Sequence, residues 1–249
     1  MASRGASRGL ASVCAVCRGW GRQRVCHECV GRFAIPVPRC GRCAIETGRP
    51  IPECGHCLAD PPPWRHAIAA VNYAYPWDRL VAGFKFHAAL ELAAAFVERM
   101  LEARKAAEAH VESAAVECAA ASDDPPLLLP VPLSAERLRE RGYNQAWELA
   151  RRLGRAQRVP AEAALLLRLR DTPHQLALPP DQRIENVRGA FAIEPRRIAE
   201  VRGRRVTLVD DVMTSGATAA ECARVLLHAG AAQVDVWVLA RTPRPHGAD

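Results

Sequence analysis

The clearest pattern of apolar and polar positions lies in the second half of the chain, where short apolar runs alternate with amphipathic stretches. The apolar runs cover residues 127–133, 164–169, 206–209 and 234–240, and helical periodicity is found at 147–153, near 181–187 and from about 219 to 229. Alternating strands and helices are typical of a parallel sheet with helices on both faces. The sequence therefore predicts an α/β fold for residues 126–249.

The first half has a different organisation. Three consecutive prolines at 61–63 act as a stiff spacer after a cysteine-rich segment, and residues 68–75 then read as a strand. Residues 77–121 have the apolar stripe of a helix. We therefore predict three parts: a small domain at 1–60, a linker strand with a hood-like helical segment at 61–125, and the α/β domain at 126–249.

Eight of the ten cysteines form four C-x-x-C pairs in the first 57 residues. They are Cys14/Cys17, Cys26/Cys29, Cys40/Cys43 and Cys54/Cys57. Each pair directs two thiolates at one ion, and a second pair completes a tetrahedron, so eight ligands predict two structural Zn²⁺ sites. Sequential pairing, as in a double zinc ribbon, is our interpretation, although the spacing also permits the first pair to join the third. Cys222 lies in an Ala-rich helical stretch, where a small buried residue explains it better than a nucleophile does.

The charge of the chain and the motifs that it lacks favour some classes of function and exclude others. The formal net charge is +7, and the first 65 residues are especially basic, which favours a nucleic-acid partner. Thiolate sites would cancel part of that charge. No apolar run reaches membrane-spanning length, and neither a P-loop nor a G-x-G-x-x-G fingerprint is present. We expect a cytoplasmic protein without a membrane span.

Residues 206–218 (VTLVDDVMTSGAT) combine a buried strand, two carboxylates and a small-residue loop before a helix. Ligands of open α/β sheets bind beyond the carboxyl ends of the strands, where Asp210 and Asp211 can accept hydrogen bonds from vicinal hydroxyls. The loop at 214–218 is small enough for main-chain N–H groups to close on a phosphate, and Thr218 is expected to cap a helix from about Ala219. The alternative is a buried strand with an Asp turn and a capped helix that binds nothing.

The segment resembles the phosphoribosyl pyrophosphate (PRPP) motif of type I phosphoribosyltransferases. The resemblance implies that the two carboxylates bind ribose and act in catalysis, that the following loop binds the 5′-phosphate, and that Mg²⁺ accompanies PRPP. The implied PRPP-binding residues are Asp210, Asp211, Val212, Met213, Thr214, Ser215, Gly216, Ala217 and Thr218.

Two further stretches resemble the ComF family and its GntX-like relatives, which join a cysteine-rich zinc segment to a phosphoribosyltransferase domain. The first is RLRERGYNQ at 137–145, and the second runs from Arg168 to Phe191. Arginine forks match phosphate oxygens, so we interpret Arg137 as PRPP-binding and Arg141 and Arg168 as catalytic. Lys85, in the FKF block that the family also shares, is a further candidate, with an exposed surface position as the alternative.

This resemblance implies a Mg²⁺-dependent phosphoribosyltransferase with an unidentified acceptor and a role in DNA uptake during natural competence. Single-stranded DNA and proteins of the competence machinery are the implied partners. The alternative function is a non-catalytic protein that senses PRPP or binds single-stranded DNA with the same fold.

Overall fold

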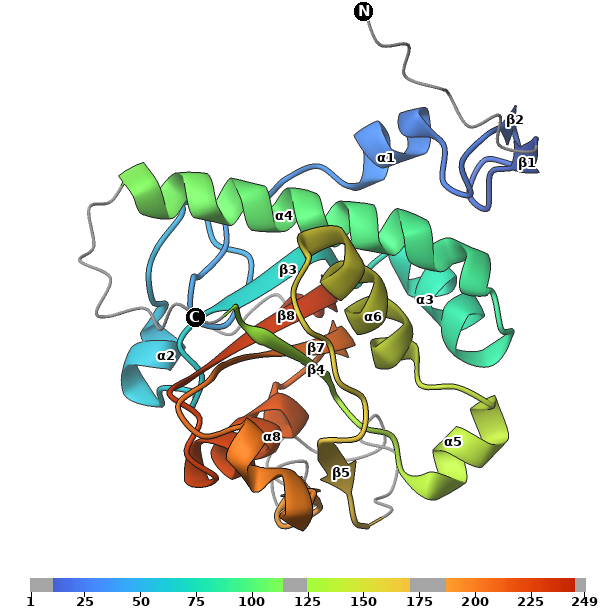
Figure 1. The fold of residues 1–249 in the computed structure, drawn as a ribbon. Helices are drawn as coiled ribbons and strands as arrows, with labels where there is room; N and C mark the ends of the chain where they lie inside the picture. The colour runs from blue at the N-terminus through green and yellow to red at the C-terminus, as the bar shows by residue number, and fades with distance from the viewer. Residues whose placement is uncertain (1–10, 114–124, 171–186, 245–249) are drawn as a thin grey trace, which may run out of the picture.

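The computed structural model describes residues 11–113, 125–170 and 187–244, and a four-stranded parallel sheet forms its centre (Figure 1). The strand order is β3-β8-β7-β4, with β3 at Ala67–Asn72, β8 at Gln233–Arg241, β7 at Arg205–Met213 and β4 at Leu127–Pro130. Leu208 of β7 lies opposite Leu129 of β4 and Val236 of β8. The predicted parallel sheet is confirmed.

Helices cover both faces of this sheet, as predicted. The helices α4 (Ala93–Ser113) and α6 (Gln145–Gln157) pack on one face and α8 (Ala217–His228) on the other (Figure 1). Because strand residues alternate between faces, Leu128 is buried with α4 and α6, whereas Leu127 and Leu129 are buried with α8. Two hydrophobic cores therefore enclose the sheet.

The helical stretch predicted at 77–121 is interrupted. It consists of α3 (Trp77–Phe86), the 3-10 helix η1 (Leu90–Leu92) and α4, and residues 114–121 lie outside the described residues. Ala88, with φ 50°, takes a left-handed conformation that a continuous right-handed helix does not allow. This break sets α3 apart as a short helix beside the sheet. The predicted linker strand before α3 is β3, which belongs to the main sheet. The domain boundary near residue 126 stays a prediction.

A second difference concerns the apolar run at 164–169. Its central part forms β5 (Leu166–Arg168), which pairs antiparallel with β6 (Phe191–Ile193) in a separate two-stranded sheet. The run was wrongly predicted to be a strand of the parallel sheet, because an apolar run signals burial and not the partner it pairs with. Most of the helix predicted near 181–187 lies outside the described residues.

Local sequence explains how α5 (Ala135–Arg141) and α6 follow β4. Ser134 caps α5 by accepting from Arg137 N at 3.3 Å, and Gly142, with φ 75°, ends it. Asn144 caps α6 by accepting from Ala146 N at 2.9 Å. In the three described stretches, no helix combines the length and apolar composition needed to cross a membrane.

The cysteine-rich segment forms small elements on two sides of the sheet. They are β1 (Ser12–Val13), β2 (Trp20–Gly21), α1 (His27–Phe33) and α2 (Gly55–Ala59). In Figure 1, β1, β2 and α1 lie above α4, and α2 lies at the left of the view. The 3-10 helix η3 (Pro195–Glu200) follows β6.

Candidate functional site

Asp210 and Asp211 lie near the end of β7, as the sequence predicts, but on opposite faces of the strand. Asp211 faces α3, where its Oδ2 lies 3.1 Å from Lys85 Nζ, and its side chain is only 2% exposed. Asp210 faces α8, where its charge acts on the buried thiol of Cys222. The pleat of a strand dictates this divergence. The two carboxylates therefore border two different spaces.

The environment of Asp210 disfavours its charge. Burial first, and then the negative charge of Asp211, raise the pKa of Asp210 to about 8, against the opposing effect of Lys85. Its Oδ1 accepts a hydrogen bond from Asp211 N at 2.8 Å. An acid whose pKa lies near neutrality can exchange a proton with a ligand, which is a common property of functional sites.

A pocket of about 360 Å³ lies beside Lys85. The residues that line it come from α3 and its C-terminal turn, from α5 and from the turn after it, and are Lys85, Phe86, His87, Ala88, Arg137, Glu140, Arg141 and Tyr143. The guanidinium of Arg141 lies 5.0 Å from the ring centroid of Phe86, and its Nη1 donates to Gln145 at 2.9 Å. The Tyr143 hydroxyl donates to the main-chain oxygen of Phe84. One lysine and two arginines thus surround a small cavity that suits a polyanion.

This arrangement brings together only part of the predicted set of residues. Arg137 and Arg141 lie in the pocket, and Lys85 joins them by reaching from α3 to Asp211. Arg168 instead lies on β5, with its guanidinium 5.5 Å from the centroid of Phe191. Four further residues of the second stretch that resembles the ComF family lie outside the described residues: Thr172, Gln175, Arg183 and Asn186.

The loop after β7 leads into α8 in the predicted strand-loop-helix order, but the cap is different. Gly216, with φ 85°, is the N-cap of α8, which begins at Ala217 and not near Ala219. Ser215 Oγ accepts from Ala217 N at 3.3 Å, so Thr218 already lies inside the first turn. Glycine takes the capping position because the chain needs a left-handed residue there. The N-terminus of α8, with the positive end of the helix dipole, faces this loop, which is the arrangement that suits an anion.

The eight cysteines form two clusters, which agree with sequential pairing. One contains Cys14, Cys17, Cys26 and Cys29, the other Cys40, Cys43, Cys54 and Cys57, and in each all four sulfur atoms lie within 4.8 Å of one another. Sulfur atoms around tetrahedral zinc lie about 3.8 Å apart. The sulfurs of Cys17 and Cys26 are 3.7 Å apart, and those of Cys43 and Cys54 are 3.8 Å apart.

Main-chain donors complete the fit of both clusters to zinc. Cys26 N donates to Cys14 Sγ at 3.3 Å, and Cys54 N donates to Cys40 Sγ at 3.2 Å, as expected for thiolate ligands. A hydrogen bond from the Cys43 thiol lowers the pKa of Cys40 to about 4, although burial opposes it. Both clusters can hold zinc, and each ion would neutralise part of the charge of its four thiolates.

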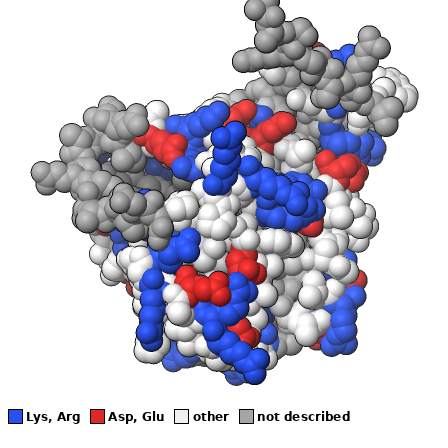
Figure 2. All heavy atoms as spheres, in the orientation of Figure 1, with Lys and Arg blue, Asp and Glu red and all other residues white. Residues whose placement is uncertain are grey.

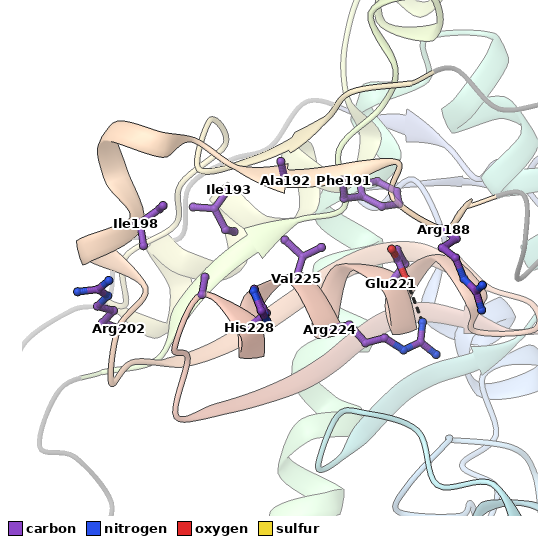
Figure 3. Close-up of a pocket in the computed structure, with 11 residues that line it drawn as sticks. Arg188, Phe191, Ala192, Ile193, Ile198, Arg202, Glu221, Arg224, Val225 and His228 are labelled. Atoms are coloured by element: carbon purple, nitrogen blue, oxygen red, sulfur yellow. Dashed lines mark hydrogen bonds and ion pairs between the residues drawn. The ribbon is translucent and has the colours of Figure 1, made fainter.

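A larger cavity, of about 860 Å³, is lined by neither Asp210 nor Asp211 and lies along α8, between β6 and η3 (Figure 3). Arg188, Arg202, Arg224 and His228 surround an aliphatic floor. Glu221 of α8 connects two segments beside this cavity, because it accepts from Gly189 N at 2.7 Å and pairs with Arg224 at 3.0 Å. Size alone therefore does not identify the candidate site, and we place it at the smaller pocket and the loop before α8.

The class of protein follows from these features. It is an α/β protein that joins a parallel sheet, with a carboxylate pair and a candidate phosphate loop, to two four-cysteine clusters. Models of known protein families give no match to the chain. The chain is 33% identical to the DNA utilization protein YhgH of Salmonella typhimurium over 236 residues, covering 92% of this chain and 90% of that protein. It is 31% identical to Competence protein F of Haemophilus influenzae over 232 residues, covering 92% and 96%.

A shorter match joins the chain to Competence protein ComFC of Bacillus subtilis, with 34% identity over 117 residues, 47% of this chain and 45% of that protein. The chain belongs to the ComF family. Among solved structures, TT1426 of Thermus thermophilus has 20% identity and a TM-score of 0.25 over 49% of this chain and 76% of its own, a likeness too low to support an argument.

Proposed function

We propose that this protein binds PRPP with Mg²⁺ and transfers its phosphoribosyl group to an acceptor. The observation that carries the proposal is the position of Asp211. This buried carboxylate lies near the end of β7, just before the loop that leads into α8, and it pairs at 3.1 Å with Lys85, one of three cationic side chains that line the smaller pocket. PRPP has a phosphate at one end, two ribose hydroxyls in the middle and a pyrophosphate at the other end. These three parts correspond to the loop before α8, the carboxylate and the cationic pocket.

Each part of PRPP is assigned to its own group of residues. The main chain from Met213 to Thr218, at the N-terminus of α8, would hold the 5′-phosphate. Asp211 would accept from the ribose hydroxyls, and Asp210, on the opposite face of β7, would support it by accepting from Asp211 N at 2.8 Å. Lys85, Arg137 and Arg141 would surround the pyrophosphate. Arg168, on β5 and outside this pocket, has no part in this assignment.

The reaction requires stabilisation of a leaving group more than a strong base. The bond from ribose C1 to the pyrophosphate oxygen breaks, pyrophosphate leaves with the electron pair, and the acceptor forms a new bond to an oxocarbenium-like C1. The cationic side chains of the pocket would stabilise the charge that develops on pyrophosphate. Bound Mg²⁺ would supply further neutralisation of the same charge.

Phosphorus NMR tests the proposal directly. Zinc-loaded protein is mixed with Mg²⁺ and PRPP, and nucleobases, ammonia and glutamine are then added in turn. We expect acceptor-dependent release of pyrophosphate that is lost in the Asp210→Asn, Asp211→Asn double variant. Asp235→Asn, at a partly buried acid near the start of β8, is the matched control and should keep the release.

The names of the relatives favour a second candidate function, in which the protein handles DNA without turnover. In that case PRPP binds and does not react. Binding of a fluorescent oligothymidine would weaken steeply with salt, because phosphate contacts release counterions. If this binding survives in the double carboxylate variant, recognition of DNA is separate from the PRPP site, and the absence of binding at low salt would remove DNA as a direct ligand.

A further inference from the structure

Arg241, the last residue of β8, links the second cysteine cluster to the loop before α8. The residue is only 9% exposed. Its Nε donates to the main-chain oxygen of Cys43 at 3.0 Å, and its Nη1 donates to the oxygen of Met213 at 3.1 Å and to that of Thr214. A single guanidinium thus joins a cysteine turn and the start of the candidate phosphate loop, and such a fork holds a more defined geometry than a point charge.

Trp64 makes a second link between the same two segments. Its Nε1 donates to the main-chain oxygen of Arg42 at 2.6 Å, within the Cys40–Cys43 turn. On the other side, a Cβ added to Gly216 would lie 3.1 Å from Trp64 Cη2, so the N-cap of α8 packs against this ring. Ala44, which follows the turn, is fully buried in the hydrophobic core that also contains Met213 and Ala217.

We propose that the second cysteine cluster and Arg241 position the phosphate loop, so that metal binding by Cys40, Cys43, Cys54 and Cys57 raises the affinity of residues 213–218 for a phosphate group. Metal held by four thiolates fixes the Cys40–Cys43 turn. The fixed turn holds the oxygen of Cys43 for Arg241 and that of Arg42 for Trp64. These two side chains then hold both ends of the loop. This inference rests on the proposed function only in taking the loop as a phosphate site.

The first cluster packs elsewhere. Arg24, beside it, pairs with Glu91 at 3.1 Å, and Trp77 Nε1 donates to the oxygen of Phe33 at 2.7 Å. Cys14 and Cys29 are buried with α3 and α4 and not with α8. Within the described residues, none of its contacts reaches the loop at 213–216. The two clusters should therefore differ in their effect on phosphate binding.

A matched pair of variants tests this difference. Cys26 and Cys54 hold equivalent positions, because each precedes a short helix and donates its N–H to the first sulfur of its cluster. We expect Cys26→Ser and Cys54→Ser each to lose one zinc by metal analysis. Cys54→Ser should bind ribose 5-phosphate about tenfold or more weakly in calorimetry, the scale of a lost outer-shell contact, whereas Cys26→Ser should stay within about twofold of wild type.

Reciprocal linkage provides a test that does not depend on the folding of a variant. In the wild type, saturating ribose 5-phosphate should slow zinc release to a chelator for one of the two ions and leave the other unchanged. Arg241→Met should abolish this protection, and Arg241→Lys, which keeps the charge without the fork, should restore only part of it.

The outcomes separate this inference from the proposed function. If the wild type binds ribose 5-phosphate but both serine variants lose affinity equally, or neither does, the positioning role is wrong and the phosphate site stands. Equal protection of both zinc ions would also overturn it. If the wild type binds neither ribose 5-phosphate nor PRPP, both proposals fail.

Discussion

Lys85 neutralises a carboxylate that the fold buries almost completely. Its side chain is 20% exposed, and its Nζ is 3.1 Å from Asp211. Lys85→Met leaves an unpaired buried charge, which we expect to cost about 3 kcal/mol, the lower end of the range for breaking a buried pair. Thermal unfolding should move down by roughly 10 °C. Lys105→Met, at the only other lysine and exposed on α4, is the control and should leave the melting temperature unchanged.

Adding Asp211→Asn to Lys85→Met tests whether the charge is the cause. The double variant has no buried charge at this position and should recover most of the stability, because replacing both partners is much less costly than removing one. PRPP binding, however, should stay low in both variants. A double variant as unstable as Lys85→Met would mean that lost packing and not charge explains the defect.

Asp210 gives the stability a pH dependence of known sign. Its pKa is raised to about 8, so the folded protein holds the proton more tightly than the unfolded chain, whose Asp titrates near pH 4. This stabilising contribution is complete below about pH 4 and is lost as the pH rises through about 8. Asp210→Asn stays neutral, and its melting temperature should therefore gain on the wild type between about pH 5 and 9. A difference that is constant with pH would argue against the raised pKa.

The sequence singles out candidate site residues more readily than it predicts which face of an element each of them occupies. The acidic pair and the loop stand out because they are contiguous, and Lys85 was a candidate only through the FKF block. Its contact with Asp211 joins residues 126 positions apart in sequence, and nothing local encodes such a contact. Likewise, Gly216 replaced Thr218 as the cap because a left-handed φ is a property of the loop path and not of hydroxyl placement.

At the scale of elements, the turn from β7 into α8 depends on Gly216 for two reasons. Its φ of 85° disfavours any side chain, and an added Cβ would lie 3.1 Å from Trp64 Cη2. Gly203, with φ 69° and no atom within 4 Å of an added Cβ, has only the first constraint. Gly203→Ala should cost about 1–2 kcal/mol in urea unfolding. Gly216→Ala should cost more and also weaken ribose 5-phosphate binding; equal costs would show that Trp64 moves aside.

The positions of most strands along the chain were predictable from the sequence, whereas their pairing was not. Strands β4, β7 and β8 follow from apolar runs separated by helices. The separation of β5 with β6 depends on contacts between residues about 25 positions apart, such as Leu167 with Ala192. Apolar composition cannot distinguish these partners from the main sheet.

At the scale of the molecule, metal changes the charge that a nucleic acid would meet. Eight thiolates and two divalent ions together lower the formal net charge of +7 by about four. On the face in Figure 2, lysine and arginine side chains are interspersed with acidic ones rather than gathered into one continuous patch. This distribution offers little support for a broad DNA-binding surface on that face.

Thiol reactivity provides a whole-molecule test of the metal sites. Metal analysis should find two zinc ions per chain. Mapping of alkylated peptides should show the eight clustered cysteines protected until a strong chelator is added. Cys222 is fully buried, and burial, with the nearby charge of Asp210, raises the pKa of its thiol well above the ordinary value, so it should react only after unfolding. Alkylation of the clustered cysteines at equal rates with and without chelator would contradict metal binding.

The last strand in the chain, β8, lies between β3 and β7 in the sheet. Until β8 has been synthesised and has joined the sheet, β3 lacks the partner strand that it has in the folded protein, and Arg241 cannot link the second cysteine turn to the loop before α8. The cysteine turns are synthesised first, but we expect the second to take its place against the loop only after β8 has been inserted. The order of synthesis therefore differs from the order in which this part of the molecule can assemble.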